Sequence, residues 1–172
     1  GLKLQGDIGK FGRADLSDVR DFAEMPSSGM ILSTSETGSL LLWDGGFVKI
    51  EVFRTDHTRP HEGPVEVVIL EGSESTSRYF ITAGADGVVR WWDYDEIENA
   101  ELTDDAPEFM IDPIQEVKIR ATVRGAGIAN SKNVDERPVH IVGMSRGQDH
   151  WIIQDKLGAL WRMDVPPPGK IG

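Results

Sequence analysis

Two histidines and a run of carboxylates are the side chains whose types and spacing suit chemistry in this sequence. His57 and His61 lie four residues apart in DHTRPHE, a spacing that would place two zinc ligands on one face of a helix. Pro60 lies between them and disfavours a helix, and the sequence offers no evident third ligand. We therefore expect no metal site from this pair.

Carboxylates dominate residues 93–108, DYDEIENAELTDDAPE, where eight of sixteen residues are acidic and none is basic. Like charges keep such a segment extended and solvated, so we interpret it as an acidic insertion between strands. Asp93 and Asp95 alternate as calcium ligands do, but the segment lacks the glycine and final glutamate of an EF-hand loop. The functional alternative is an electrostatic contact with a basic partner, and its candidate residues are Asp95, Glu96, Glu98, Glu101, Asp104 and Asp105.

Signs of catalysis are missing from the rest of the sequence. There is no cysteine, no G-x-S-x-G nucleophile motif and no G-x-x-x-x-G-K-[ST] phosphate loop. The glycines of RGAGIANSK (124–132) lack that spacing and indicate a loop. We expect no catalytic residue and no cofactor, and the abundant carboxylates leave a carboxylate-based hydrolase as a minor alternative.

Charge and hydropathy restrict the partners. The 18 basic and 29 acidic residues give a net charge of −11, which disfavours a nucleic-acid backbone as ligand. No apolar run reaches the roughly 18 residues that a membrane-spanning helix needs. The absence of cysteine suits a reducing, intracellular compartment. The sequence therefore predicts protein partners, and neither nucleic acid nor membrane.

The elements that must position these side chains are short strands. Runs of β-branched and aromatic residues alternate with clusters of Gly, Ser, Asp and Pro, which is typical of antiparallel all-β structure, and helix signals are poor. The predicted strands are residues 19–25, 30–35, 40–44, 47–53, 65–71, 79–84, 88–93, 139–145, 151–155 and 159–165.

Three of these segments repeat a common pattern around a turn glycine. They read STSETGSLLLWD, TAGADGVVRWWD and IQDKLGALWRMD. In each, a large apolar residue lies five positions after the glycine and an aspartate lies six after it. These residues are Gly38, Trp43 and Asp44 in the first, Gly87, Trp92 and Asp93 in the second, and Gly158, Met163 and Asp164 in the third.

The repeated segments resemble WD40 repeats, and HEGPV (61–65) resembles the H-x-x-x-V with which such a repeat begins. The resemblance implies four-stranded propeller blades and a hydrogen-bonded tetrad, which carries over onto His61, Thr82, Asp86 and Trp92. A buried imidazole and a buried indole N–H both need such partners. The first and third repeats depart from the pattern, because Thr37 replaces the turn aspartate and Met163 replaces the tryptophan.

Adjacent tryptophans in VVRWWD have opposite expected roles. Because strand residues alternate faces, we expect Trp92 to enter the core between sheets and Trp91 to face the other way. Packing on the neighbouring blade is the structural interpretation for Trp91. An exposed contact for a protein partner is the alternative.

Three blades fall short of a closed propeller, which needs about four to eight. We therefore expect residues 1–172 to be a partial propeller, either a fragment of a larger one or one that closes by association. Its blade-like units end near 44–53, 93–119 and 164. We further expect an acidic insertion and irregular connection at 95–137, and a proline-rich linker at 166–172.

Four longer runs resemble axonemal WD-repeat proteins of cilia and flagella over about residues 9–165. They are SETGSLLLWDGGFVKIE, HEGPVEVVILE, YFITAGADGVVRWWDYDEIENAEL and WIIQDKLGALWRMD. The resemblance implies a non-catalytic scaffold in the axonemal cytoskeleton, within a tether that links an inner-arm dynein motor domain to the doublet microtubule. It also implies that motor domain and a sister axonemal WD-repeat protein as partners, with tubulin as a further candidate. A generic intracellular WD40 adaptor in an unrelated complex is the alternative.

Overall fold

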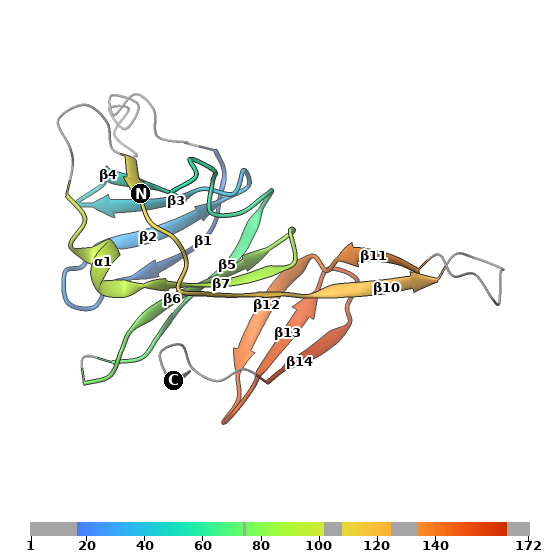
Figure 1. Ribbon diagram of the computed structural model, residues 1–172. Coiled ribbons are helices and arrows are strands. Elements are labelled where there is room, and N and C mark those ends of the chain that lie inside the picture. Colours follow the sequence, from blue (N-terminus) through green and yellow to red (C-terminus); the bar gives the residue numbers. More distant parts are fainter. Residues whose placement is uncertain (1–16, 74, 102–107, 125–133, 165–172) are drawn as a thin grey trace, which may run out of the picture.

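The computed structural model describes residues 17–73, 75–101, 108–124 and 134–164, which form successive antiparallel sheets (Figure 1). Blade 1 contains β1 (Val19–Glu24), β2 (Ile31–Ser35), β3 (Leu40–Asp44) and β4 (Phe47–Phe53). Blade 2 contains β5 (Val65–Glu71), β6 (Tyr79–Gly84), β7 (Val88–Asp93) and β9 (Gln115–Lys118). Blade 3 contains β12 (Ile141–Arg146), β13 (Trp151–Asp155) and β14 (Leu160–Met163).

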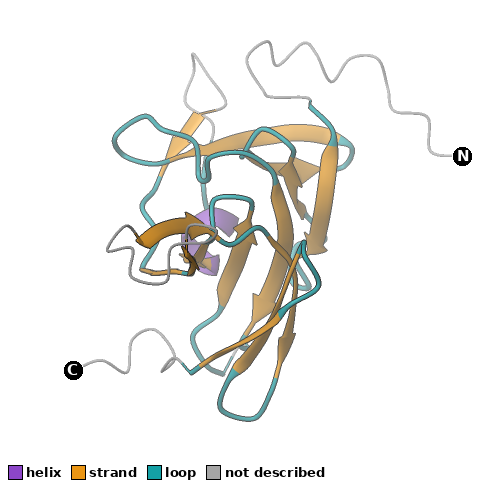
Figure 2. Cartoon of the chain, turned by 90° about the vertical axis from the view of Figure 1, so that its right-hand side faces the viewer, coloured by secondary structure: helices purple, strands orange, loops and turns teal. Residues whose placement is uncertain are grey.

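Three further pieces lie in the connections between these strands. After β7 the chain forms the short helix α1 (Tyr94–Glu98), and β8 (Glu108–Met110) then pairs in parallel with β4 as a fifth strand of blade 1. The strands β10 (Arg120–Arg124) and β11 (Val134–Pro138) form a hairpin that projects beyond blade 2 in Figure 1. Figure 2 shows how small the helical share of the fold is.

The predicted all-β architecture is confirmed, and three of its sheets follow one another along the chain as the expected blades do. The strands β3, β4, β5, β6, β7 and β13 begin and end at the predicted residues. Blade 3 has three strands among the described residues, where four were expected. No helix in the described part of the chain is both long and apolar enough to cross a membrane.

Residues 95–137 are more regular than the sequence indicates. Where an irregular connection is expected, the structure has most of α1 together with β8, β9, β10 and β11. The helix begins because the Asp93 carboxylate accepts a hydrogen bond from the backbone N–H of Glu96, at 2.9 Å, as an N-cap does. Five residues are too few to show a helical period, so pattern analysis misses this helix.

Two apolar cores lie between the blades. The first joins β2, β3 and β4 of blade 1 to β5, β6 and β7 of blade 2, and Trp92 is fully buried in it. The second joins blade 2 to β12, β13 and β14 of blade 3, and Trp91 is 3% exposed in it. Burial of an indole removes about 150–250 Å² from water, worth at most about 4–6 kcal/mol. The adjacent tryptophans therefore hold blade 2 to both neighbours.

Side chains of blade 1 also complete the backbone hydrogen bonding of blade 2. β5 is an edge strand of its sheet, so part of its backbone has no strand partner. The Thr34 hydroxyl donates to the carbonyl oxygen of Val65 at 2.7 Å. The Asp21 carboxylate accepts from the N–H of Val68 at 2.9 Å. These contacts position blade 2 directly against blade 1.

Candidate functional site

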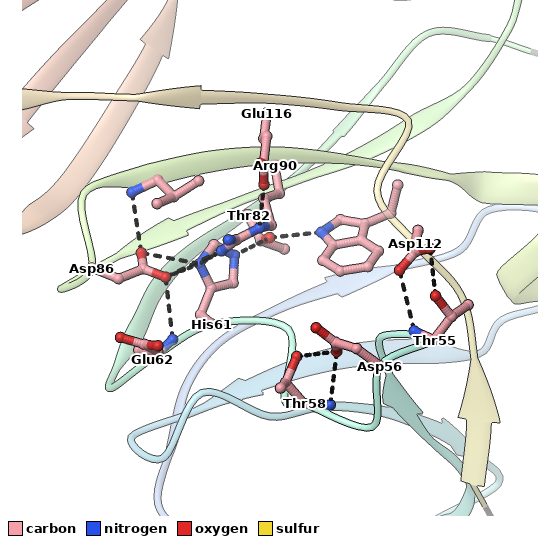
Figure 3. A network of polar contacts seen from close by, with 12 residues as sticks. Thr55, Asp56, Thr58, His61, Glu62, Thr82, Asp86, Arg90, Asp112 and Glu116 are labelled. Atoms are coloured by element: carbon pink, nitrogen blue, oxygen red, sulfur yellow. Dashed lines mark hydrogen bonds and ion pairs between the residues drawn. The ribbon is translucent and has the colours of Figure 1, made fainter.

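The polar network of blade 2 is the site that the repeat pattern singles out. His61 lies in the connection that leads to β5, Thr82 lies on β6, Asp86 lies in the β6–β7 turn, and Trp92 lies on β7. Figure 3 shows the side chains of His61, Thr82 and Asp86 gathered beside that of Arg90. The antiparallel pairing of β5, β6 and β7 brings these residues together although the sequence separates them by up to 31 positions.

A single chain of hydrogen bonds runs through the four side chains. The Trp92 indole N–H donates to the Thr82 hydroxyl oxygen at 2.8 Å, and that hydroxyl lies 2.6 Å from His61 Nε2. His61 Nδ1 lies 3.0 Å from a carboxylate oxygen of Asp86. Because an ionised carboxylate only accepts, Nδ1 carries the proton, and Nε2 accepts from the Thr82 hydroxyl. The direction of donation is therefore the same along the chain, from Trp92 to Asp86.

Burial decides the charge state of this network. Burial lowers the pKa of His61 below its ordinary value of 6.5, although the hydrogen bond to Asp86 acts in the opposite direction. Burial alone would raise the pKa of Asp86. Hydrogen bonds from His61 and from the backbone N–H groups of Val88 and Glu62 outweigh it and hold that pKa below its ordinary value of 3.8. At neutral pH the imidazole is therefore neutral and the carboxylate is ionised.

Arg90 and Glu116 extend the network, and the repeat pattern does not point to either. The Arg90 guanidinium donates to Asp86 at 3.2 Å and to Glu116 at 3.0 Å, although Arg90 is only 6% exposed. A cation in the middle of the apolar strand VVRWWD, four residues after Asp86, is the signal that would have found Arg90. Glu116 lies on β9, and only the pairing of β7 with β9 places it opposite Arg90.

The network is built to hold structure and not to react. The His61 side chain is fully buried, and both ring nitrogens are engaged within the network. A general base needs a proton-accepting atom within reach of a substrate, and His61 offers none. The role of His61 is structural: through the network it joins the start of β5, the β6–β7 turn and β7 inside the fold.

The first repeat keeps one link of this network. The Trp43 indole N–H donates to the Ser33 hydroxyl oxygen at 2.7 Å, at the same ten-residue spacing as Trp92 and Thr82. The Ser35 hydroxyl accepts from the N–H of Ser39 at 3.0 Å and lies 2.9 Å from the Thr37 hydroxyl. Serine and threonine hydroxyls therefore organise the turn where the second repeat uses Asp86.

The third repeat organises the same turn with a carboxylate that the repeat pattern does not identify. Met163 packs in the second core in place of a tetrad tryptophan. Asp155 accepts from the Trp161 indole N–H at 2.9 Å and from the N–H groups of Leu157 and Ala159, both at 2.9 Å. The Trp161 hydrogen bond, with the backbone ones, keeps the pKa of Asp155 below its ordinary value. An aspartate three residues before the turn glycine is the sequence feature that would have identified Asp155.

The turn glycines all have a left-handed backbone, with φ of +96° at Gly38, +72° at Gly87 and +89° at Gly158. At the first two, the chain also passes too close for a side chain. A Cβ on Gly38 would collide with the carbonyl of His61, and one on Gly87 would lie 2.7 Å from the carbonyl oxygen of Ile119. In blades 1 and 2, glycine is therefore required both by the left-handed backbone and by the lack of space for a side chain.

The motif aspartates play three different parts at the strand ends. Asp44 is exposed at the end of β3, and Asp93 caps α1. Asp164 accepts from Arg162 at 2.9 Å. The structure therefore brings only the tetrad residues together, and the motif aspartates lie apart from it.

The candidate partner contacts differ in how far they are exposed. Trp91 is not one of them: at 3% exposure it packs in the second core, so it offers no surface to a partner. Asp95, Glu96 and Glu101 are exposed on and beside α1, whereas Glu98 is partly buried and accepts from the Ser27 hydroxyl at 3.2 Å. The remaining candidates, Asp104 and Asp105, lie outside the described residues.

The two histidines of DHTRPHE do not form a pair. His57 is exposed in a turn with a left-handed backbone, φ +67°, whereas His61 is buried in the network. Within the described residues, no three His, Asp or Glu side chains gather in an arrangement that could hold a metal ion.

The arrangement of blades, together with the tetrad of blade 2, defines a segment of a WD40-repeat β-propeller. The crystal structure of the C-terminal WD40 domain of Sif2 has a similar fold, with a TM-score of 0.53 over 88% of this chain and 32% of that one, at 14% sequence identity. No protein-family model matches the sequence.

Sequence comparison identifies the particular relatives. Cilia- and flagella-associated protein 44 of Mus musculus is 38% identical over 165 residues, which are 96% of this chain. The proteins of the same name are 38% identical over the whole chain in Chlamydomonas reinhardtii, and 33% identical over 99% of it in Trypanosoma brucei brucei. The chain is homologous to one segment of these proteins, and it spans only 8–10% of their length.

Proposed function

We propose that this chain is a non-catalytic protein-interaction segment of an axonemal WD40 scaffold. In its parent protein it would belong to a tether that links an inner-arm dynein motor domain to the doublet microtubule. The observation that carries the proposal is the identity of 33–38% over nearly the whole chain with proteins named for cilia and flagella in three distant organisms.

The buried network of blade 2 agrees with a scaffold role. Its hydrogen bonds and the two interblade cores hold the strands in a fixed arrangement. A rigid set of blades can present the loops and edges between strands to other proteins. An interaction segment of this kind needs stable geometry and no reactive group.

The exposed acids beside α1 are the proposed contact with a basic patch on the dynein motor domain or on a sister axonemal WD-repeat protein. Glu96 and Glu101 are exposed, and no side-chain partner for either is found among the described residues. Complementary charge of this kind raises association rates and weakens with salt. Asp95 differs, because it pairs with Arg78 at 2.9 Å and so also serves the fold.

A pull-down from detergent-extracted axonemes tests the proposal, with the chain as bait and mass spectrometry as readout. A second bait carries Glu96→Lys and Glu101→Lys. A matched control carries Asp44→Lys and Glu24→Lys, which change the net charge equally at two exposed positions of blade 1. We expect inner-arm dynein heavy chains and a WD-repeat partner with the native and control baits, and weaker capture with the second bait and at high salt.

The outcomes separate the function from the site. Equal capture by all three baits would refute the acidic contact and retain the tether role. If a bait that circular dichroism shows to be folded enriches no axonemal protein, the tether role is refuted. A generic adaptor would then be the better interpretation.

A further inference from the structure

The connection between β7 and β9 takes an indirect path that no blade requires. After the third strand of blade 2 the chain forms α1, then pairs β8 with blade 1, and only afterwards supplies β9 to blade 2. Figure 1 shows both α1 and β8 beside the strands of blade 1. We call the described parts of this connection, residues 94–101 and 108–114, the strap.

The first anchor of the strap is α1. Tyr94 and Ile97 are fully buried in the core between blades 1 and 2. The Tyr94 ring stacks on Phe80 with centroids 5.2 Å apart, and the Arg78 guanidinium lies 4.0 Å from the same ring. The Tyr94 hydroxyl also reaches Ser27, in the β1–β2 turn of blade 1, at 3.3 Å. The helix thus contacts both blades.

The second anchor lies at the outer edge of blade 1. β8 pairs Phe109 with Val52 in a parallel register, and the Ile111 N–H then donates to the carbonyl oxygen of Phe53 at 2.8 Å. Asp112 closes the contact, since its carboxylate accepts from the Thr55 hydroxyl at 2.6 Å and from the Thr55 N–H at 3.1 Å. These hydrogen bonds keep the pKa of Asp112 below its ordinary value, so the carboxylate is ionised at neutral pH.

The strap covers an edge that would otherwise be open. β4 would be the last strand of blade 1, with a row of backbone N–H and C=O groups facing outward. A three-residue strand forms few hydrogen bonds of its own, so β8 depends on the contacts that follow it, at Ile111 and Asp112. Phe109 and Ile111 pack on the same core as Tyr94 and Ile97, so a change at the Asp112 anchor should influence α1 and the β4 edge together.

We propose that the strap is a conformational clamp that makes blades 1 and 2 one cooperative unit and closes the β4 edge. Blade 3 joins blade 2 through the second core and through an ion pair between Arg146 on β12 and Glu71 on β5, at 3.0 Å, and none of the strap contacts described above reaches it. Loosening the Asp112 anchor exposes the β4 edge and also releases α1, which precedes Asp112 by more than ten residues. The strands of blade 3 keep their native protection. This coupling separates a clamp from a merely local contact.

Hydrogen exchange of the full chain, followed by mass spectrometry, tests the clamp with the variant Asp112→Ala. We expect amide exchange in residues 47–53 and in residues 94–98 to rise by about fivefold to tenfold together, because the anchor loses two hydrogen bonds to a charged group. Residues 141–163 should keep their native exchange. Asp164→Ala is the matched control, because it removes an exposed aspartate that accepts from one neighbouring side chain in blade 3.

Two results would overturn the clamp. One is a change confined to residues 54–56 and 111–113, which would make Asp112 a local contact. The other is an equal rise in all three blades, which would make the whole chain a single unit. If Asp112→Ala does not fold, Asp112→Asn keeps the size and one acceptor of the side chain, and the same comparison applies at smaller amplitude.

Discussion

Replacing Thr82 by valine tests the role assigned to the tetrad. The two side chains are close in shape, so the change removes a hydroxyl and leaves the volume nearly unchanged. That hydroxyl accepts from the Trp92 indole and donates to His61 Nε2, and all three residues are almost completely buried. The substitution therefore leaves one buried donor, the Trp92 indole N–H, and one buried acceptor, His61 Nε2, without a hydrogen-bond partner.

The cost follows from counting those two atoms. A buried polar group without a partner costs about 1–3 kcal/mol, so the pair costs about 2–6 kcal/mol of unfolding free energy. A change of tautomer does not rescue His61, since a proton moved to Nε2 would be lost from the hydrogen bond between Nδ1 and Asp86. Natural domains are stable by about 5–15 kcal/mol, so a loss of this size is readily measured.

Urea denaturation followed by circular dichroism measures the effect. Thr122→Val is the matched control, because Thr122 lies exposed on β10 outside the network, and we expect it to change the unfolding free energy by less than about 0.5 kcal/mol. In a double-mutant cycle, Trp92→Phe should cost less in the Thr82→Val background than in the native chain, because the indole donor is then already unpaired. A Thr82→Val cost no larger than that of the control would refute the assigned hydrogen-bond chain.

The pH dependence of unfolding, the charge of Arg90 and the turn glycines provide three further predictions. The pKa of His61 is lowered on folding, so its stabilisation is complete above about pH 6.5 and declines as the pH falls below that value; Asp86 adds a second decline below about pH 3.8, and stability that stays constant from pH 7.5 to 5 would contradict this. Arg90→Met should lower the unfolding free energy by about 3 kcal/mol in urea titrations, because it leaves a buried carboxylate without its cation, and a neutral outcome would show that the ion pair is dispensable. Gly87→Ala should lower the melting temperature more than Gly158→Ala, since both strain a left-handed backbone but only the first also meets the β9–β10 connection, and equal shifts would contradict the close approach.

Local patterns predicted the elements whose cause is local. The runs LLLWD and YFITAG became strands with the predicted bounds, because β-branched and aromatic residues between turn residues favour extended backbone. Alternation also predicted correctly that Trp91 and Trp92 face opposite ways. The partner role considered for Trp91 failed for a non-local reason: blade 3, more than 45 residues later in the sequence, covers it.

Acidic composition was a poor guide to residues 94–101. The segment is rich in carboxylates, but its apolar residues Tyr94, Ile97 and Ala100 lie on one side and enter the interblade core. The charged residues then remain outside, as on any helix at the surface of a core. A short amphipathic turn inside an acidic run has too few residues for its period to be detected, so burial here became visible only in the folded chain.

The sequence by itself determined the blade repeat and the turn glycines, because each depends on spacing within one hairpin, and its resemblance to WD40 repeats pointed to the four residues of the tetrad. The tertiary structure decided which surfaces those repeats bury. Arg90 meets Glu116 through strand pairing, Thr34 completes the edge of β5, and the strap places β8 against β4. Such contacts join residues whose separation follows no period, and only the packing of one sheet against the next brings them within hydrogen-bonding distance.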